Sequence, residues 1–264
     1  MTRFGFIGVG SIASSIVAGL CEGVDDPPDV LLSPRNARRS AELAERLPSV
    51  RVAVDNQAVV DGSDIVVLCV LPHLARQVLA PLNFRPDHQV VSALAGVHLE
   101  VVRALVAPAD DVARSIPVPA VATRASLTPV HPPSRGAQEL YGRLGGLMPI
   151  DDELAYESVA AASATVAAHY RYLATIAEWL AEHGIGPGPA RAYVAATFAD
   201  LGRELTTEDV DFDRLAAAHT TPGGLNEQFA THLANTGTYA QVRSGLDGVL
   251  GRIAPAQPSP DPDA

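Results

Sequence analysis

The sequence feature that most constrains the fold begins at residue 4, where an apolar run ends in a glycine-containing turn. The segment reads Phe4-Gly5-Phe6-Ile7-Gly8-Val9-Gly10-Ser11-Ile12-Ala13 and leads into a helical pattern. A strand, a Gly-x-Gly-x-x-Ala turn and a helix in this order are the context in which proteins bind dinucleotides. Gly8 allows the tight turn, and Gly10 lets the backbone approach a pyrophosphate. The start of the helix, at Ser11 and Ile12, offers N–H groups to the phosphates. A strand–helix turn that holds no ligand is the alternative.

Strand-like runs alternate with helical patterns up to residue 150. The run Ile65-Val66-Val67-Leu68-Cys69-Val70 is almost wholly apolar, which is typical of a strand buried on both faces. Further strands are expected at 30–32, 89–93, 112–116, 127–130 and 147–150, and helices near 37–47, 73–79 and 135–144 and from residue 99. The alternation predicts an α/β fold with a doubly wound parallel sheet of the Rossmann type over residues 1–151.

The pattern changes after residue 151, where strand-like runs stop and Ala-rich helical stretches begin. We expect helices at 153–183, 189–205, 211–218, 223–235 and 239–253. The first of them is apolar on more than one face, which indicates a bundle and a subunit interface, with burial inside a monomer as the alternative. Residues 152–253 are therefore predicted to form an all-α domain for substrate binding and dimerisation, in a homodimer or higher homo-oligomer. The Pro- and Asp-rich residues 254–264 are predicted to be disordered.

Composition disfavours several classes of function. The formal net charge of −11 argues against nucleic acids and anionic membranes as partners. No signal peptide is expected, and charged residues interrupt every apolar stretch before it reaches bilayer length. Cys21 and Cys69 lack the spacing of metal ligands, which predicts reduced core cysteines in a cytoplasmic protein without a metal site. The chain contains no lysine, so chemistry that needs a lysine base or Schiff base is excluded.

The end of the second expected strand determines which dinucleotide is preferred. An acidic residue there usually holds the 2′-hydroxyl of NAD. This chain has Ser33-Pro34-Arg35-Asn36-Ala37-Arg38 instead, whose hydroxyl, amide and guanidinium groups suit a 2′-phosphate. NADP(H) is therefore predicted as the cofactor in preference to NAD(H). The alternative is that Arg35 and Arg38 belong to a solvated first turn.

Six motifs together resemble the pyrroline-5-carboxylate reductase family over nearly the whole chain, up to about Gly251. They are residues 6–13, Ser33-Pro34-Arg35, Asp55-Asn56 with Ala58, residues 67–73, Ser92-Ala93-Leu94-Ala95-Gly96-Val97 and Thr220-Thr221-Pro222-Gly223-Gly224. Members of this family reduce a cyclic imine to proline with NAD(P)H, and their helical domains interlock as dimers that often form larger rings. The resemblance implies cofactor binding by Gly8, Gly10, Ser11, Ile12, Ser33, Arg35, Asn56, Val70, Pro72, Ala93 and Ala95.

The resemblance also implies where a small carboxylated imine would bind. Thr221, Gly223 and Gly224 are expected to receive the substrate carboxylate, because a Pro-Gly-Gly helix entrance presents backbone N–H groups. An ordinary helix start is the alternative. Asn226 stands where the family has a threonine that hydrogen-bonds the substrate nitrogen, and its amide can donate or accept there. A helix-surface amide is the alternative for Asn226.

Histidines supply the candidates for proton transfer, because histidine titrates near neutrality. His169 is the predicted catalytic histidine, and His219 and His73 are further candidates. Each of the three also has an ordinary structural explanation. An iminium enters already protonated, so a strong general acid is not obligatory.

Other positions depart from the family pattern and predict an altered substrate pocket. Leu71 stands in place of a family lysine, and residues 163–169 replace a glycine-rich segment. The segment Arg114-Ser115-Ile116-Pro117-Val118-Pro119 is one residue shorter than its counterpart and lacks Asn-Thr. The sequence therefore predicts a reductase of a cyclic imine other than pyrroline-5-carboxylate.

Two other functions remain open from the sequence. One is a different NADP-linked oxidoreductase, such as a deazaflavin-dependent enzyme or a hydroxyacid dehydrogenase, although the latter normally needs a catalytic lysine. The other is a non-catalytic NADP-binding or sensor protein that retains the scaffold. Binding of NADPH without turnover of any cyclic imine would favour the second.

Overall fold

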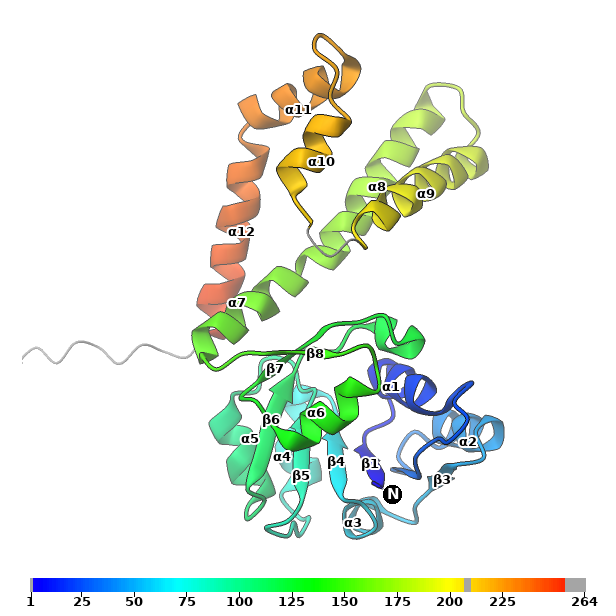
Figure 1. Cartoon of the computed structure of the whole chain (residues 1–264), viewed down its shortest axis with the longest axis vertical. Helices are drawn as coiled ribbons and strands as arrows, with labels where there is room; N and C mark the ends of the chain where they lie inside the picture. Colours follow the sequence, from blue (N-terminus) through cyan, green and yellow to red (C-terminus); the bar gives the residue numbers. More distant parts are fainter. Residues whose placement is uncertain (1, 207–209, 255–264) are drawn as a thin grey trace, which may run out of the picture. The chain divides into compact units, whose positions relative to one another are not determined.

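The protein is described by a computed structural model that covers residues 2–206 and 210–254. Contacts divide the chain into two compact units, a sheet-containing part and an all-helical part (Figure 1). The first unit runs to Val159 and includes Ala254, and the second runs from Ala160 to Ile253. The predicted change of domain at 151/152 precedes α7 (Glu153–Ser163), whereas the contacts divide the chain within this helix. The predicted disordered tail lies, apart from Ala254, outside the described residues.

The first unit is built on an eight-stranded sheet with the order β3-β2-β1-β4-β5-β6-β7-β8. The strands are β1 (Phe4–Ile7), β2 (Val30–Leu32), β3 (Val50–Val52), β4 (Ile65–Leu68), β5 (Gln89–Ser92), β6 (Asp111–Ser115), β7 (Thr128–His131) and β8 (Leu147–Pro149). All pairings from β3 to β6 are parallel, which confirms the predicted Rossmann-type sheet. The edge strand β3 is absent from the prediction because two of its three side chains, Arg51 and Val52, are exposed.

The far edge of the sheet differs from the predicted parallel arrangement, because β7 runs antiparallel to β6. A parallel return needs a crossover, usually through a helix. The link from β6 to β7 contains only the short 3₁₀ helix η2 (Pro119–Thr123), which packs against α1 (Ser11–Cys21). The next link contains α6 (Arg135–Gly142), and β8 accordingly runs parallel to β7.

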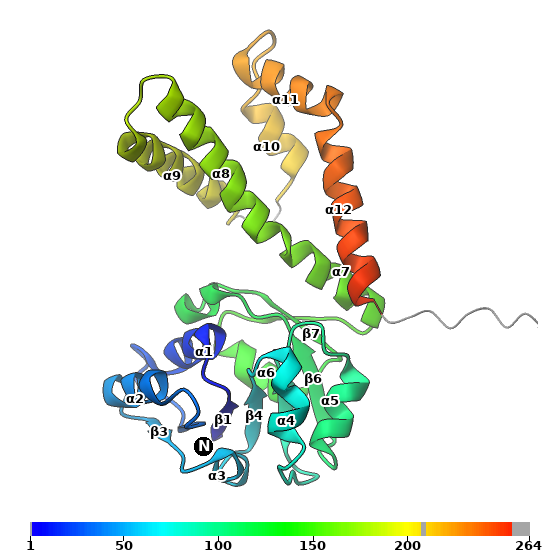
Figure 2. The ribbon, with the colours of Figure 1, turned by 180° about the vertical axis from the view of Figure 1, so that it is seen from behind.

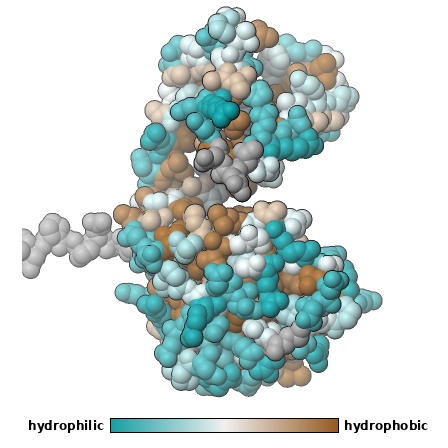
Figure 3. All heavy atoms as spheres, viewed as in Figure 1, coloured by the Kyte–Doolittle hydropathy of each residue, from teal (hydrophilic) through white to brown (hydrophobic). Residues whose placement is uncertain are grey.

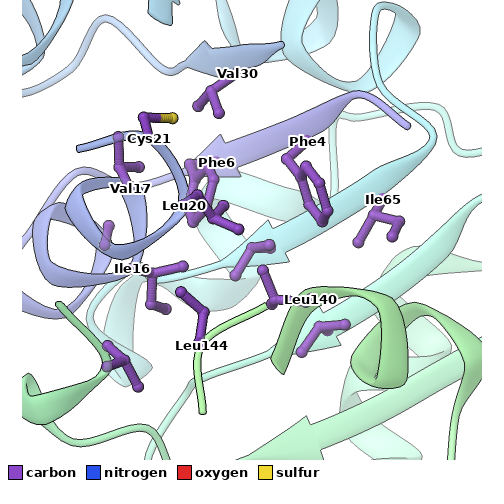
Figure 4. Close-up of a cluster of buried hydrophobic side chains, with 14 of the residues drawn as sticks. Phe4, Phe6, Ile16, Val17, Leu20, Cys21, Val30, Ile65, Leu140 and Leu144 are labelled. Carbon is purple, nitrogen blue, oxygen red and sulfur yellow. The ribbon is translucent and has the colours of Figure 1, made fainter. Parts of the chain in front are cut away.

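Helices cover both faces of the sheet and bury two apolar clusters. On one face, α1, α2 (Ala37–Arg46) and α6 pack around Phe4, Phe6 and Leu140 (Figure 4). On the other face, α3 (Asn56–Asp61), α4 (Ala75–Leu79) and α5 (Leu99–Val106) pack around Ile7 and Val90. All four residues of β4 are buried, as its apolar run predicts. Burial of each large apolar side chain stabilises the unit by about 1.5–3 kcal/mol, so the sheet rigidly positions the loops at its ends.

The second unit consists of helices, as predicted. Beyond the end of α7 these are α8 (Thr165–Glu182), α9 (Pro187–Glu204), α10 (Phe212–Ala218), α11 (Leu225–Asn235) and α12 (Thr238–Ile253). The single helix predicted for 153–183 is wrong, because Ala164 separates α7 from α8. Helices α8 and α9 lie side by side (Figure 2).

Few side chains of the second unit are buried. Its buried apolar residues are Ala161, Ala177, Ala190 and Val194. Its exposed aromatic residues are Tyr170, Tyr172, Trp179, Tyr193, Phe212, Phe229 and Tyr239, and Figure 3 shows apolar side chains on the visible face of this unit. The helices therefore leave most of their large apolar side chains on the surface. Among the described helices, none combines the length and the apolar character that a bilayer span requires.

Candidate functional site

Three loops with predicted cofactor residues start at the same edge of the sheet, because β1, β4 and β5 are parallel. Backbone hydrogen bonds continue the ladder into these loops: Cys69 N donates to Ile7 O over 2.8 Å, and Ala93 N donates to Leu68 O over 2.9 Å. Ligands of open α/β sheets bind at this carboxyl edge. The arrangement therefore brings together Gly8, Val70, Pro72, Ala93 and Ala95.

The glycine turn combines one glycine that the backbone requires with one that leaves space in front of α1. Gly8 has a φ of +93°, and a Cβ there would lie 2.8 Å from backbone atoms of Cys69 and Val70. At Gly10, by contrast, a Cβ would meet no atom within 4 Å. Gly8 is thus required by the fold, whereas Gly10 leaves open space in front of the first turn of α1. Ser11 and Ile12 begin that turn, whose amides lack partners within the helix.

Ser33 also supports this turn, by a contact that the sequence analysis did not predict. Its side chain is buried, and its hydroxyl accepts a hydrogen bond of 2.9 Å from Gly8 N. Asn36 Nδ2 donates to Val9 O, also over 2.9 Å. The loop after β2 therefore braces the glycine turn.

Two arginines, one in this loop and one in α2, are candidates for binding a phosphate. Arg35 is exposed, as a contact with a phosphate requires. Arg39 Nη1 donates to Ser11 Oγ over 3.3 Å, and both residues line a hollow of about 360 Å³ between α1 and α2. The sequence analysis missed Arg39, although its place directly after Arg38 and close behind Arg35 was the available signal. The guanidinium groups of Arg35 and Arg39 suit a dianionic phosphate ester better than a hydroxyl, although Glu42 lines the same hollow as Arg39.

The remaining predicted cofactor residues are accessible. Asp55 caps α3 by accepting from Ala58 N over 2.7 Å, and this cap places the half-exposed Asn56 in the first turn. Val70 and Ala93 are half-buried, and Pro72 and Ala95 are exposed.

The two cysteines and His73 were also singled out in the sequence, and the structure shows their surroundings. Cys69 and Cys21 are free thiols, as predicted, and burial raises the pKa of Cys69 to about 12. The Cys69 thiol therefore stays protonated at neutral pH. His73, in the 3₁₀ helix η1 (Pro72–Leu74), is exposed.

In the second unit, both glycine N–H groups in the turn before α11 donate hydrogen bonds to oxygen atoms of the chain itself. Gly223 has a φ of +73°, and its N–H donates to Glu227 Oε2 over 2.6 Å. Gly224 N donates to Thr221 O over 2.8 Å. Of the predicted carboxylate-binding groups, the Gly223 N–H therefore binds a carboxylate of the chain itself, and the Gly224 N–H is used within the turn.

The two predicted catalytic residues have different surroundings. Asn226 Nδ2 donates to His219 O over 2.7 Å, and His219 Nε2 lies 3.1 Å from Glu204 Oε2. His169 is exposed on α8, where its ring lies 6.5 Å from that of Phe198. His169 also lines a mostly apolar groove of about 710 Å³ formed by α7, α8, α11 and α12. Asn226 and His219 thus share one cluster, and His169 belongs to another.

A buried ionic cluster in the first unit has no counterpart in the predicted site. Arg114 on β6 is 2% exposed, and its Nη1 lies 2.6 Å from Glu157 Oε1 and 3.4 Å from Glu153 Oε1 on α7. His98 Nδ1 lies 3.8 Å from both of these oxygens. The Arg114 guanidinium also lies 4.6 Å from the centre of the Tyr156 ring, and burial raises the pKa of that phenol. The cluster could not be read from the sequence, because its members lie up to 59 positions apart, from His98 to Glu157.

Comparisons with known proteins agree with this fold. Residues 3–96 match the family described as NADP oxidoreductase, coenzyme F420-dependent. Pyrroline-5-carboxylate reductase 2 of Bacillus subtilis is 25% identical over 237 residues, which cover 86% of this chain and 85% of the relative. The crystal structure of 1-pyrroline-5-carboxylate reductase from Streptococcus pyogenes has a TM-score of 0.79 at 25% identity, over 96% of this chain and 98% of its own. Pyrroline carboxylate reductase from Plasmodium falciparum, solved with NADP bound, shares the fold with a TM-score of 0.76 at 15% identity, over 95% and 96% of the two chains.

Proposed function

Because this chain is a distant member of the pyrroline-5-carboxylate reductase family, we propose that it is an NADP(H)-dependent oxidoreductase that reduces a small carboxylated cyclic imine. The observation that carries the proposal is the turn at Gly8 and Gly10, which lies at the same sheet edge as the loops after β4 and β5. A pyrophosphate on the first turn of α1 directs the rest of a dinucleotide along this edge.

The residues of the chain would bind and orient the reactants. NADPH supplies the hydride when it is bound. The amides at Ser11 and Ile12 would hold the pyrophosphate, and the loops at Val70–Pro72 and Ala93–Ala95 would hold the nicotinamide end. Asn226 would donate to the imine nitrogen. His169 stays the predicted proton donor, although it lies in a different cluster from Asn226, and His219 is the histidine in contact with Asn226. Such positioning accounts for much of the rate that an enzyme adds to a two-substrate reaction.

Cofactor preference gives the first prediction. Arg35→Ala removes an exposed guanidinium that would face the 2′-phosphate, so NADPH should bind about tenfold or more weakly while NADH affinity stays unchanged. Fluorescence titration of the wild type and the variant with both cofactors measures this. Arg103→Ala, at an exposed position on α5, is the matched control and should change neither affinity. Equal affinities for NADPH and NADH in the wild type would reject the assignment.

The choice of substrate is tested by NADPH consumption with a panel of cyclic imines, with and without a carboxylate on the ring. We expect slow reduction of pyrroline-5-carboxylate and faster reduction of another carboxylated imine. Rates on pyrroline-5-carboxylate typical of a dedicated reductase would contradict the altered pocket. Tight NADPH binding without turnover of any imine would support a non-catalytic NADP-binding protein instead.

Glu227 gives a second prediction, because its carboxylate holds the Gly223 N–H that a substrate carboxylate would use. Glu227→Ala frees this donor and removes a like charge, so the KM for a carboxylated imine should fall by about threefold to tenfold. The KM for an imine without a carboxylate should not change. Glu182→Ala, at an exposed position on α8, is the control. An unchanged KM for carboxylated imines in Glu227→Ala would remove this turn from the proposed substrate site.

We also propose that the protein is a homodimer or a larger homo-oligomer in the cytoplasm. The support is the set of exposed aromatic side chains on the second unit, since monomeric proteins rarely leave large contiguous apolar patches in water. Subunit interfaces are enriched in Tyr, Trp and Phe, the residue types that are exposed here.

A further inference from the structure

The loop that follows β5 is joined to α7 by a histidine and two carboxylates. His98 is the residue before α5, and no side-chain cap at this helix start involves it. Its Nδ1 is buried without a hydrogen-bond partner and lies 3.8 Å from Glu153 Oε1 and from Glu157 Oε1. Ala95, a proposed nicotinamide contact, is three residues before His98. The position of His98 therefore affects the backbone on which the reactive end of the cofactor is proposed to lie.

The charges around His98 do not balance while its ring is neutral. Glu153 and Glu157 on α7 carry two negative charges, and among the described residues Arg114 on β6 is the arginine that pairs with them. Glu157 is 1% exposed, and its Oε2 has no hydrogen-bond partner. Arg114 already occupies the position of a bound cation, 2.6 Å from Glu157 Oε1, so a divalent metal ion would be repelled by it. A proton on His98 brings the cluster to neutrality and supplies a donor at the orphaned Nδ1.

We propose that His98 is a positioning residue: in its protonated form it ties the 93–98 loop to Glu153 and Glu157 and thereby holds the nicotinamide-binding loop in place. The proposal rests on the proposed NADP(H) function. By linkage, a form of the loop that binds a proton more tightly is favoured at low pH and lost as pH rises. The affinity for NADPH should accordingly decrease as the pH rises and His98 loses its proton.

The decisive experiment compares the wild type with His98→Asn, whose amide places a neutral donor near the position of Nδ1. The dissociation constant of NADPH is measured by nicotinamide fluorescence from pH 6 to pH 8. We expect NADPH binding to weaken about threefold to tenfold across this range in the wild type. In His98→Asn, the part of this weakening that comes from His98 should be absent. The 2′-phosphate of NADPH also titrates, so the same series with NADH, which lacks that phosphate, isolates the contribution of the protein. His232→Asn, at an exposed histidine on α11, should keep the wild-type profile.

A second measurement needs no cofactor and separates the two proposals. Amide hydrogen exchange of residues 94–98 in the free protein, corrected for the intrinsic effect of pH, should be slower at pH 6 than at pH 8 in the wild type only. If NADPH fails to bind but this difference is present, the proposed function fails, while the pH-dependent link between the 93–98 loop and α7 stands. Superimposable pH profiles and exchange rates for the wild type and His98→Asn would overturn the proposal. A rise in Tm with Zn²⁺ that His98→Asn abolishes would also overturn it and assign the cluster to a metal ion.

Discussion

Gly10→Ala should leave the fold intact and weaken NADPH binding by about tenfold to a hundredfold. The backbone at Gly10 has a φ of −92°, which alanine adopts, and a Cβ there meets no atom within 4 Å. The added methyl group projects into the space that a pyrophosphate would occupy in front of α1. Thermal unfolding should therefore be unchanged, and fluorescence titration should show the loss. A variant that binds NADPH as tightly as the wild type would place the dinucleotide elsewhere.

Gly8→Ala is the matched comparison, because the two glycines serve different purposes. The positive φ at Gly8 and the 2.8 Å approach to Cys69 and Val70 make a Cβ there costly, by about 3 kcal/mol or more. We expect Gly8→Ala to lower both the unfolding free energy and NADPH affinity. The pair thus separates a glycine needed for folding from one needed for ligand approach.

Arg114→Met should destabilise the protein by about 3–5 kcal/mol, because it leaves Glu157 charged, buried and without its partner. Glu157→Leu should cost less, since Arg114 keeps its contact of 3.4 Å with the half-buried Glu153. The double variant should recover most of the loss, because no uncompensated charge remains on the pair. Urea unfolding of the four proteins measures the coupling between the two residues.

Arg143→Ala is the surface control for this cycle. Its partner Glu139 lies one helical turn away, and both side chains are about 40% exposed. Exposed pairs of this kind contribute roughly 0–1 kcal/mol. A loss for Arg114→Met as small as that for Arg143→Ala would show that the buried pair is not held as described.

Most of the sheet could be predicted from the pattern of apolar residues within short stretches of the sequence. The apolar run Ile65–Leu68 predicts a strand buried on both faces, and the structure places it between β1 and β5. The direction of β7 could not be predicted, because it depends on how η2 packs against α1. The end of α7 also escaped prediction, since Ala164 is a good helix former and gives no stop signal.

The candidate site likewise has one part that could be predicted from the sequence and another that could not. The turn at Gly8 and Gly10 is contiguous in the chain, so its spacing reveals its conformation. The brace from Ser33 to Gly8 and the cluster of Arg114 with Glu157 join residues that are far apart in the sequence. Such contacts exist only once the chain has folded, and no periodicity marks them.

A change of cofactor preference in this protein would have few positions open to it. Ser33 and Asn36 hold the glycine turn through hydrogen bonds to Gly8 and Val9. An acidic residue at either position would disturb this turn and should lower the proposed affinity for NADPH and NADH alike. The exposed Arg35 has no comparable structural duty and can vary at little cost to folding. A natural or engineered route from the proposed NADP(H) preference toward NAD would therefore begin at Arg35 and leave Ser33 and Asn36 unchanged.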